Sequence, residues 1–344
     1  MDLRDFDYAL PPSAIAQSPA ARRDASRLLL IDRARQSVED HLFAELPTLL
    51  RAGDCLVVNN SRVIPARVMA RTAAGREIEL LFLDGEAPAR WRALVRPGRH
   101  CREGAILSVG VANGPRLRVA GVAEDGARIV ERLDGIIDDL LRRHGRPPLP
   151  PYIARHATPS AEDRERYQTV YAKDAGSVAA PTAGLHFTEA LLARLRGGGV
   201  EVHELTLHVG PATFRPIRAP RVEAHALAAE RVVIPGPVAD AVTRAQGEGR
   251  RVIAVGTTTT RALEGSADEK GAVAATREPV GLFIVPGYRF RVVDALITNF
   301  HLPRSTLLVL VSAFAGRELI GKAYAHAIRA GYRFYSYGDA CLIV

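Results

Sequence analysis

The sequence predicts an α/β protein, with a layered, barrel-like α/β main domain into which a small antiparallel β-barrel domain is inserted. The length of 344 residues exceeds that of most single domains and favours two. After residue 152, helical and strand-like stretches alternate, as they do in layered α/β domains. Between residues 67 and 130, short strand-like runs follow one another, which is typical of a small barrel or sandwich. We therefore expect the main domain at 1–62 and 152–344 and the barrel domain at 63–151.

The N-terminal part contains two short apolar runs, bounded by Gly or Asp, that are too short for helices. Leu28–Ile31 and Cys55–Val58 are therefore predicted to be buried strands. The stretch between them, from about Val38 to Leu50, has a helix-like pattern. These elements open the main domain.

Evenly spaced apolar runs predict the strands of the barrel domain. They are Ile78–Leu83, Trp91–Val95, Ile106–Val109, Leu117–Val122 and Ala127–Val130. One short helix is predicted at Ile136–Arg143. The Pro-rich segment Arg146–Tyr152 is typical of a stiff linker, so we place the domain boundary there.

Helices and strands alternate through the second half of the chain. Helices are predicted at Glu189–Arg196, at Val238–Gly247 and from Ser305 onward. The predicted strands are Val200–Val209, Val252–Val255, Leu282–Val285 and Ala295–Thr298.

The composition is that of a globular protein with a basic surface. Hydrophobic residues make up 47% and charged residues 24%, which leaves no case for long disorder. The formal charge of +8 comes almost wholly from arginine, because Lys173, Lys270 and Lys322 are the only lysines. Guanidinium groups suit phosphates and flat bases, so a polyanionic partner is compatible with this surface. A genome that prefers arginine codons would explain the same numbers.

Several function classes are disfavoured by what the sequence lacks. The densest apolar run, Leu307–Val311, is far short of the ~20 residues that cross a bilayer, and the N-terminus does not resemble a secretory signal. The cysteines, Cys55, Cys101 and Cys341, are scattered singly, which fits a reducing cytoplasm. No GxGxxG, phosphate-binding NTPase loop or HExxH motif occurs. We therefore expect a cytoplasmic protein with no membrane association, no metal site and no standard dinucleotide fold.

Two neighbouring segments, Tyr167–Tyr171 and Gly176–Thr188, combine small residues with a histidine and aromatic rings. Small residues allow a ligand to approach the backbone, and histidine can gain or lose a proton. The segments predict the wall of a pocket; the alternative is a tight loop into a helix capped by Thr188, with the aromatic rings in the core. The candidate residues are Tyr167, Tyr171, Ser177, Thr182, Gly184, His186 and Phe187.

Two further loops each follow a predicted strand and precede a predicted helix. Gly256–Arg261 offers hydroxyls, backbone N–H groups and an arginine for a carboxylate or ribose, although its threonines could simply cap the helix. If the strands run parallel, this loop, Thr298–Ser305 and residues 176–188 meet beyond the carboxyl ends of the strands, where open α/β sheets bind ligands. The candidates in the two loops are Thr257, Thr258, Arg261, Asn299 and His301.

Long blocks of the sequence resemble the S-adenosylmethionine:tRNA ribosyltransferase-isomerases of queuosine biosynthesis. They occur in family order from end to end and include NNSRVIPAR from Asn59, ALVRPG from Ala93, ERYQTVYA from Glu165, GSVAAPTAGLHFT from Gly176, HVGPATF from His208, VGTTTTRALE from Val255, PGYRF from Pro286, TNFHLPRSTLL from Thr298 and YRFYSYGDA from Tyr332. The first block follows a predicted strand and would otherwise be interpreted as a hinge.

The resemblance implies an α/β domain with an inserted β-barrel. It implies that S-adenosylmethionine is a consumed ribosyl donor and that no separate cofactor is bound. The implied acceptor is the 7-aminomethyl-7-deazaguanine base at the wobble position of a tRNA anticodon loop. The implied products are epoxyqueuosine in tRNA, adenine and methionine, and we expect the enzyme to be a monomer.

This chemistry needs a base, because the sulfonium acidifies the adjacent ribose methylene. We favour His186 first and His301 second. An aromatic face of Tyr167, Tyr171 or Phe187 would suit the sulfonium. The donors for the methionine carboxylate or the ribose would be Arg261 and the threonines beside it.

Recognition of an anticodon base requires that the base be splayed out while arginines hold nearby phosphates. Arg62, Arg96 and Arg99 are the candidates for tRNA binding; ordinary surface charge is the alternative.

The chain departs from the family pattern at a few positions. Ala228 replaces a histidine of the family's Met-His-x-Glu block, Leu207 a threonine, and Pro211-Ala212 an Ala-Gly pair. Two other classes of function stay open on the sequence alone. A methyltransferase is disfavoured by the missing glycine loop, and a non-catalytic RNA-binding module by the dense Gly, His and Thr loops.

Overall fold

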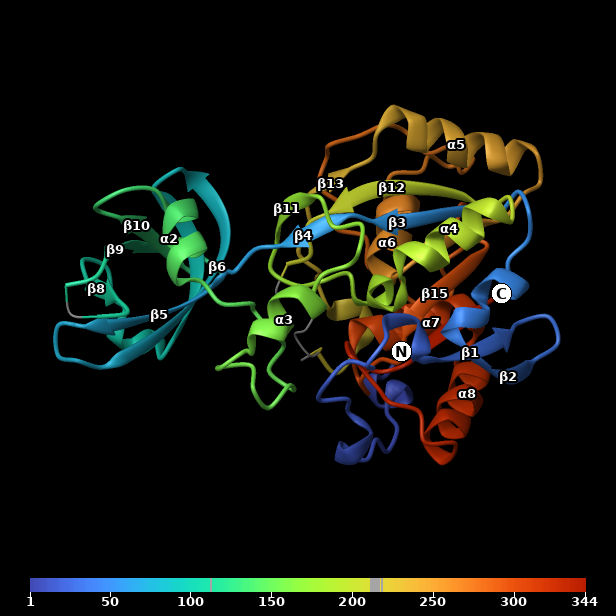
Figure 1. Ribbon diagram of the computed structural model, residues 1–344, viewed down its shortest axis with the longest axis horizontal. Coiled ribbons are helices and arrows are strands. Elements are labelled where there is room, and N and C mark those ends of the chain that lie inside the picture. The colour runs from blue at the N-terminus through green and yellow to red at the C-terminus, as the bar shows by residue number, and fades with distance from the viewer. Residues whose placement is uncertain (112, 211–216, 218) are drawn as a thin grey trace. The chain divides into compact units, whose positions relative to one another are not determined.

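The computed structural model describes residues 1–111, 113–210, 217 and 219–344, and divides the chain into two compact units (Figure 1). The α/β unit comprises Met1–Ser61, Gln168–Asp174 and Ala180–Val344. The barrel unit comprises Arg62–Tyr167 and Ala175–Ala179. The predicted fold class is confirmed, because one unit contains a large sheet with helices and the other a closed antiparallel barrel.

The second unit boundary lies beyond the Pro-rich segment where we placed it, because residues 152–167 belong to the barrel unit. Two arginines tie this stretch to the residues just before it. Arg146 Nη1 donates to the carbonyl of Ala157 at 3.2 Å, and Arg164 Nη2 donates to the carbonyl of Gly145 at 3.4 Å. The stretch 152–167 is therefore hydrogen-bonded to the residues before it, and the chain leaves the barrel unit only after this stretch.

The α/β unit is organised around an eight-stranded sheet with the strand order β13-β12-β3-β14-β15-β16-β1-β2 (Figure 1). Strands β12, β3, β14 and β15 are parallel, while β16 runs antiparallel to β15. All residues of β3, β14, β15 and β16 are buried, as in sheets whose two faces are covered. The bounds are β1 Arg27–Asp32, β2 Ser37–Leu42, β3 Cys55–Asn59, β12 Glu201–Leu207, β13 Val232–Val233, β14 Val252–Val255, β15 Ala295–Asn299 and β16 Ala340–Ile343.

Helices pack on this sheet because alternate strand residues present apolar side chains to its faces. Leu56, Ile253 and Ile297 share a core with Leu191 and Leu195 of α4. Helices α5 and α6 pack on β3, β12 and β14, and α8 packs on β1. The bounds are α1 Leu46–Leu49, α4 Glu189–Gly197, α5 Gly236–Gly247, α6 Thr257–Gly265, α7 Thr306–Ala315 and α8 Arg317–Arg329.

The barrel unit is a closed six-stranded barrel with the order β10-β7-β6-β5-β8-β9. Its buried residues include Val68, Leu80, Leu117 and Val130, and Leu140 of α2 packs against the same core. The bounds are β5 Arg67–Thr72, β6 Glu77–Ala87, β7 Arg90–Arg96, β8 Ile106–Val109, β9 Arg116–Val122, β10 Arg128–Arg132, α2 Ile137–His144 and α3 Ala161–Arg166. The short strands β4 Ser61–Val63 and β11 Asp174–Ser177 pair with each other.

Two predicted elements are wrong. The helix expected at Val38–Leu50 is mostly strand β2, because Ser37–Leu42 pairs with β1 in an antiparallel hairpin and only Leu46–Leu49 is α-helical. The strand expected at Leu282–Val285 is irregular, although Ile284 is fully buried. Arg261 Nε donates to the carbonyl of Leu282 at 3.0 Å, so a side chain satisfies this backbone group instead of a strand.

Two absences hold for the described part of the chain. No helix among these residues is long and apolar enough to cross a membrane. No group of three or more His, Cys, Asp or Glu side chains in the same residues is placed to hold a metal ion. Residues 211–214 of the HVGPATF block, with the Pro211-Ala212 departure, lie outside the described residues.

Candidate active site

The three candidate loops meet within the α/β unit. The N–H of Gly256 donates to the carbonyl of Ile297 at 2.8 Å, which joins the ends of β14 and β15. Thr182, in the 3-10 helix η6 (Thr182–His186), donates through Oγ1 to Asn299 Oδ1 at 3.0 Å. A Cβ added to Gly256 would lie 3.5 Å from Ala183 Cβ, so η6 also adjoins the start of α6. The loops therefore converge at the carboxyl ends of parallel strands, as the sequence predicted.

Asn299 is the centre of a buried polar cluster. Its Nδ2 lies 3.1 Å from His186 Nε2 and donates to the carbonyl of Tyr335 at 3.2 Å. Its Oδ1 accepts from Thr182, so both the nitrogen and the oxygen of the amide have hydrogen-bond partners. The carbonyl of Tyr335 can only accept, and this fixes Nδ2 on the side that faces His186.

The same cluster determines the tautomer of His186. Because Asn299 Nδ2 is a donor, His186 Nε2 must be the acceptor and carry no proton. On the other side of the ring, Ser26 Oγ lies 2.7 Å from His186 Nδ1 and donates to the carbonyl of Arg23 at 3.3 Å. Ser26 therefore accepts from Nδ1–H. A series of hydrogen bonds thus runs from the carbonyl of Arg23 through Ser26, His186 and Asn299 to the carbonyl of Tyr335. Because both carbonyls can only accept, they require the same neutral Nδ1–H tautomer of His186.

Burial keeps His186 neutral. Desolvation, followed by the charges of Arg333 and Arg23, lowers the pKa of His186 to about 3. The imidazole also stacks on Phe43 with ring centroids 5.0 Å apart. His186 is thus uncharged near neutral pH, which is the state that a general base requires.

His301 lies on the same loop as Asn299 but belongs to a different set of contacts. Its Nε2 lies 3.0 Å from Thr298 Oγ1, and burial lowers its pKa to about 3. Its backbone is held from both sides, because its N–H donates to Tyr324 Oη at 3.0 Å and its carbonyl accepts from Tyr8 Oη at 2.5 Å. Both tyrosines line a cavity of about 400 Å³ bounded by residues 5–9, α7 and α8. The hydroxyls of Tyr8 and Tyr324 therefore hold the backbone of this loop in place.

Three buried hydroxyls near these loops have no hydrogen-bond partner among the described residues: Thr169 Oγ1, Tyr171 Oη and Thr258 Oγ1. A buried polar atom without a partner costs about 1–3 kcal/mol. Tyr171 Oη lies over Gly184, where an added Cβ would be only 2.0 Å away. Such groups are available to a ligand.

Phe187 and Thr257 are also buried in the α/β unit. Phe187 is fully buried and packs edge-on against Phe43 and Tyr171, with ring centroids 5.0 Å and 6.3 Å apart. This contact set makes it a core residue behind η6. Thr257 is the first residue of α6.

Arg261 has different neighbours from those expected of a ligand-binding group. Its Nη1 pairs with Glu230 Oε2 at 2.6 Å and its Nε donates to Leu282, with both charged side chains at most 5% exposed. Nη2 has no partner among the described residues, and Arg261 lines a cavity of about 10 Å³. That volume is about that of one water molecule. Ala228, where the family histidine is missing, is exposed.

The remaining candidates belong to the barrel unit. Tyr167 is buried at the end of α3, and the carbonyl of buried Ser177 accepts from the N–H of Ile64 at 2.9 Å. Arg62, Arg96 and Arg99 are exposed.

Sequence reasoning missed two residues that gather with Arg99. Arg76 Nη1 and Arg99 Nε both approach His100 Nε2, at 3.2 Å and 3.0 Å. Desolvation and these two charges lower the pKa of His100. Arg76 and Arg99 therefore offer an exposed pair of guanidinium groups beside His100.

In the α/β unit, sequence reasoning missed Ser26, Phe43 and Tyr335. No sequence pattern pointed to Ser26 or Phe43 as residues of the site. The YRFYSYGDA block did point to the Tyr335 segment, but not to its backbone carbonyl. Glu230, the partner of Arg261, is the acidic residue retained from the family's Met-His-x-Glu block.

These features define a class: an α/β enzyme fold with a buried polar site at the carboxyl ends of parallel strands and an inserted β-barrel. Comparison with known proteins is consistent with this class. The model of a family described as "Queuosine biosynthesis protein" matches residues 3–343. The chain is 50% identical over 348 residues to a protein of Geobacter metallireducens and 47% identical over 348 residues to one of Desulfitobacterium hafniense, with 100% of each chain covered. Both are named S-adenosylmethionine:tRNA ribosyltransferase-isomerase.

A solved structure is also similar. The crystal structure of S-adenosylmethionine tRNA ribosyltransferase from Thermotoga maritima matches with a TM-score of 0.55 and 36% sequence identity, covering 99% of this chain and 100% of that one. The chain belongs to the queuosine biosynthesis protein family, and it is an enzyme of the ribosyltransferase-isomerase class.

Proposed function

We propose that this enzyme transfers and isomerises the ribosyl moiety of S-adenosylmethionine onto the 7-aminomethyl-7-deazaguanine base at the wobble position of tRNA. The products would be epoxyqueuosine in tRNA, adenine and methionine. The observation that carries the proposal is the convergence of three loops on one buried cluster, in a chain that matches enzymes of this name over its whole length. S-adenosylmethionine is consumed, so the reaction as written needs no further cofactor.

The reaction balances with one base and the groups of the substrates. The base removes a proton from the ribose methylene beside the sulfonium, and the freed electron pair forms a double bond to the next carbon as the bond of that carbon to the ring oxygen breaks. The ring oxygen becomes a carbonyl oxygen as adenine departs with the electron pair of its bond to the sugar and takes up a proton. The amine of the deazaguanine base adds to the double bond at the carbon that does not carry sulfur, and loses a proton. The electron pair displaced to the sulfur-bearing carbon attacks the carbonyl carbon, and the resulting alkoxide closes the epoxide by displacing methionine, which leaves with the electron pair of its bond to carbon.

His186 is our first candidate for the base and His301 the second. The lone pair of His186 Nε2 accepts from Asn299 Nδ2, where the three loops meet, so Asn299 would have to release it for His186 to take the substrate's proton. Its low pKa of about 3 makes it a weak base. The acidity that the sulfonium gives to the methylene would have to compensate for that weakness.

Hydroxyls without partners would bind the polar parts of S-adenosylmethionine. Thr258 Oγ1 and Tyr171 Oη suit the ribose or the carboxylate, because each is buried and lacks a hydrogen bond within the described chain. Hydrogen bonds from a ligand to these hydroxyls would offset the free-energy cost of burying them without partners. Of the aromatic rings proposed for the sulfonium, Tyr171 is favoured over Phe187, because Tyr171 is 8% exposed whereas Phe187 is fully buried.

The barrel unit would contribute to tRNA binding through exposed arginines. Arg96 and Arg99, together with Arg76, would neutralise phosphates near the anticodon. Replacing Arg96 or Arg99 by Ala should weaken tRNA binding and reduce the salt slope of the affinity by about one for each phosphate that is no longer neutralised. We also propose that the enzyme acts as a monomer in the cytoplasm.

The test is a turnover assay on the purified full chain with S-adenosylmethionine and tRNA carrying the 7-aminomethyl-7-deazaguanine base. We expect adenine release to match the amount of epoxyqueuosine in digested tRNA. Replacing His186 by Ala should lower the rate by about two to four orders of magnitude if His186 is the base. Near-normal turnover of this variant, with a strong loss in the equivalent His301 variant, would move the role to His301.

The two competing functions give different outcomes in the same assay. A methyltransferase would place a labelled methyl group of S-adenosylmethionine in the tRNA. A binding module would bind tRNA equally well with and without S-adenosylmethionine and release no adenine.

A further inference from the structure

The turn Tyr332–Asp339 contributes a backbone carbonyl to the candidate active site. The carbonyl of Tyr335 accepts from Asn299 Nδ2 at 3.2 Å and from the N–H of Gly338 at 2.9 Å. To present this carbonyl, Tyr335 adopts a φ of 75°, in the left-handed region that large side chains rarely occupy. A conformation of this kind persists only where the surrounding structure enforces it.

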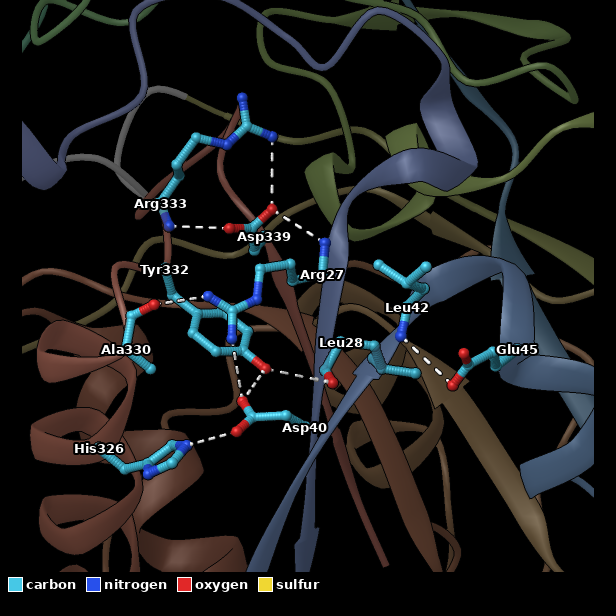
Figure 2. Close-up of polar contacts among 10 residues, drawn as sticks. All are labelled: Arg27, Leu28, Asp40, Leu42, Glu45, His326, Ala330, Tyr332, Arg333 and Asp339. Atoms are coloured by element: carbon cyan, nitrogen blue, oxygen red, sulfur yellow. Dashed lines mark hydrogen bonds and ion pairs between the residues drawn. The ribbon is translucent and has the colours of Figure 1, made fainter.

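Asp339 supplies the contacts that hold this turn closed (Figure 2). Its side chain is buried, and Oδ2 accepts from the N–H of Arg333 at 2.8 Å. Its own N–H donates to the carbonyl of Arg333 at 2.8 Å, so the two ends of the turn are tied twice. Oδ1 accepts from the N–H of Arg27 at 3.0 Å, which anchors the turn to the start of β1.

The Tyr335 carbonyl is important because it is always a hydrogen-bond acceptor, whereas most other groups in the cluster can exchange donor and acceptor roles. The hydroxyls of Thr182 and Ser26 can rotate, the Asn299 amide can flip, and the His186 ring can exchange tautomers. A backbone carbonyl can only accept. If the Tyr335 carbonyl moved away, Asn299 could turn its oxygen toward His186 Nε2 and thereby favour the Nε2–H tautomer, in which no lone pair faces the loops.

We propose that Asp339 is a positioning residue for the reaction. By holding the Tyr335 carbonyl against Asn299, it keeps His186 as the Nδ1–H tautomer with the Nε2 lone pair directed to the cluster. The importance of this tautomer for turnover rests on the proposed function of His186. The tautomer itself can be observed without any turnover.

The structure offers a matched control in Asp40, which contacts the same arginine (Figure 2). Asp40 accepts from Arg27 Nη2 at 3.2 Å, from Tyr332 Oη at 2.5 Å and from His326 Nε2 at 3.0 Å. These three bonds involve neither the Asn299 amide nor the His186 ring. Asp40→Asn therefore changes a carboxylate that contacts the first residue of the turn, and it leaves the hydrogen bonds from the backbone N–H groups of Arg27 and Arg333 to Asp339 in place.

The experiment is nitrogen NMR of the full chain labelled at its histidine ring nitrogens, for the wild type, Asp339→Asn and Asp40→Asn. The disappearance of one signal pair in His186→Gln assigns the resonances. We expect the wild type and Asp40→Asn to show His186 protonated at Nδ1 and bare at Nε2. In asparagine an NH2 group replaces one carboxylate oxygen and would face the backbone N–H of either Arg27 or Arg333, so Asp339→Asn should show a mixed or reversed tautomer. Its turnover should fall by on the order of 10-fold or more.

A second variant reaches the turn without touching Asp339. A Cβ on Gly338 would lie 2.4 Å from the carbonyl oxygen of Arg333, so Gly338→Ala should open the turn and shift the same resonances. Adding Tyr335→Gly to Asp339→Asn should restore the wild-type tautomer, because glycine adopts a φ of this sign readily and keeps the carbonyl.

The outcomes separate the two proposals. Wild-type His186 resonances in folded Asp339→Asn or Gly338→Ala would overturn the positioning role, as would equal shifts in Asp40→Asn. A tautomer change confined to the turn variants, in a protein whose wild type forms no epoxyqueuosine, would support the control of the His186 tautomer by Asp339 and reject the proposed function.

Discussion

The burial of His186 predicts a specific loss of stability in mild acid. The unfolded chain has an ordinary histidine pKa of 6.5, whereas the folded pKa is about 3. Between these values the unfolded state binds more protons than the folded state, so the free energy of unfolding rises with pH. Neutral, buried His186 therefore causes no loss in the free energy of unfolding above pH 6.5. That free energy falls as the pH drops from 6.5 toward 3.

The magnitude follows from the distance between the pH and the unfolded pKa. One pKa unit corresponds to about 1.4 kcal/mol, so lowering the pH from about 7.5 to about 5 should cost about 2 kcal/mol for His186. This value does not depend on the exact folded pKa as long as that pKa lies well below 5. His301, with a pKa also lowered to about 3, should contribute a similar amount.

The assay is urea denaturation at both pH values, followed by far-ultraviolet circular dichroism, which reports mainly on helices α4 to α8 of the α/β unit. The free energy of unfolding of His186→Gln should change by about 2 kcal/mol less between the two pH values than that of the wild type. The His186→Gln, His301→Gln double variant should change by about 4 kcal/mol less. Equal pH dependence in the wild type and His186→Gln would refute the assignment of a buried, neutral His186.

Three further predictions concern packing, charge and metal. Gly184→Ala should lower the free energy of unfolding by about 1–3 kcal/mol, because its Cβ would meet Tyr171 Oη, and adding Tyr171→Phe should recover part of the loss on urea denaturation. Glu230→Ala should cost about 3–5 kcal/mol by leaving the buried Arg261 charge unpaired, and adding Arg261→Met should reduce that cost; a larger cost in the double variant would contradict the ion-pair argument. Turnover measured with excess EDTA should equal turnover without it, and a loss that added metal restores would contradict the metal-free reaction that we propose.

Much of the fold was predictable because its central strands are buried on both sides. Val252–Val255 and Ala295–Ile297 are continuous apolar runs, the first followed by Gly256 and the second preceded by Asp294, and such runs fit few other structures. Strand β2 was not predictable in this way, since Ser37–Leu42 carries mixed polarity and is a strand because it pairs with β1. Leu282–Val285 has the composition of a strand, but its neighbourhood supplies a side-chain partner instead.

The sequence allowed us to predict which loops form the candidate site. Parallel strand order brings the loops after β14 and β15 to one edge, and this required only the recognition of alternating helices and strands. The partners of individual atoms were not predictable. Ser26 and Tyr335 reach His186 and Asn299 from the two ends of the chain, and no local pattern indicates which ring nitrogen each contact fixes. The pairing of Arg261 with Glu230, 31 residues apart, likewise depends on tertiary packing.

The central claim is that the ribosyl carbons of S-adenosylmethionine, rather than its methyl group, are transferred to tRNA. The most direct measurement is a single-turnover reaction with S-adenosylmethionine labelled in the ribose carbons, in which label in tRNA and free adenine are quantified together. We predict one labelled nucleoside for each adenine released, and neither product in Asn299→Ala. Adenine release without label in tRNA, or tRNA labelled only by a methyl-labelled donor, would contradict the account.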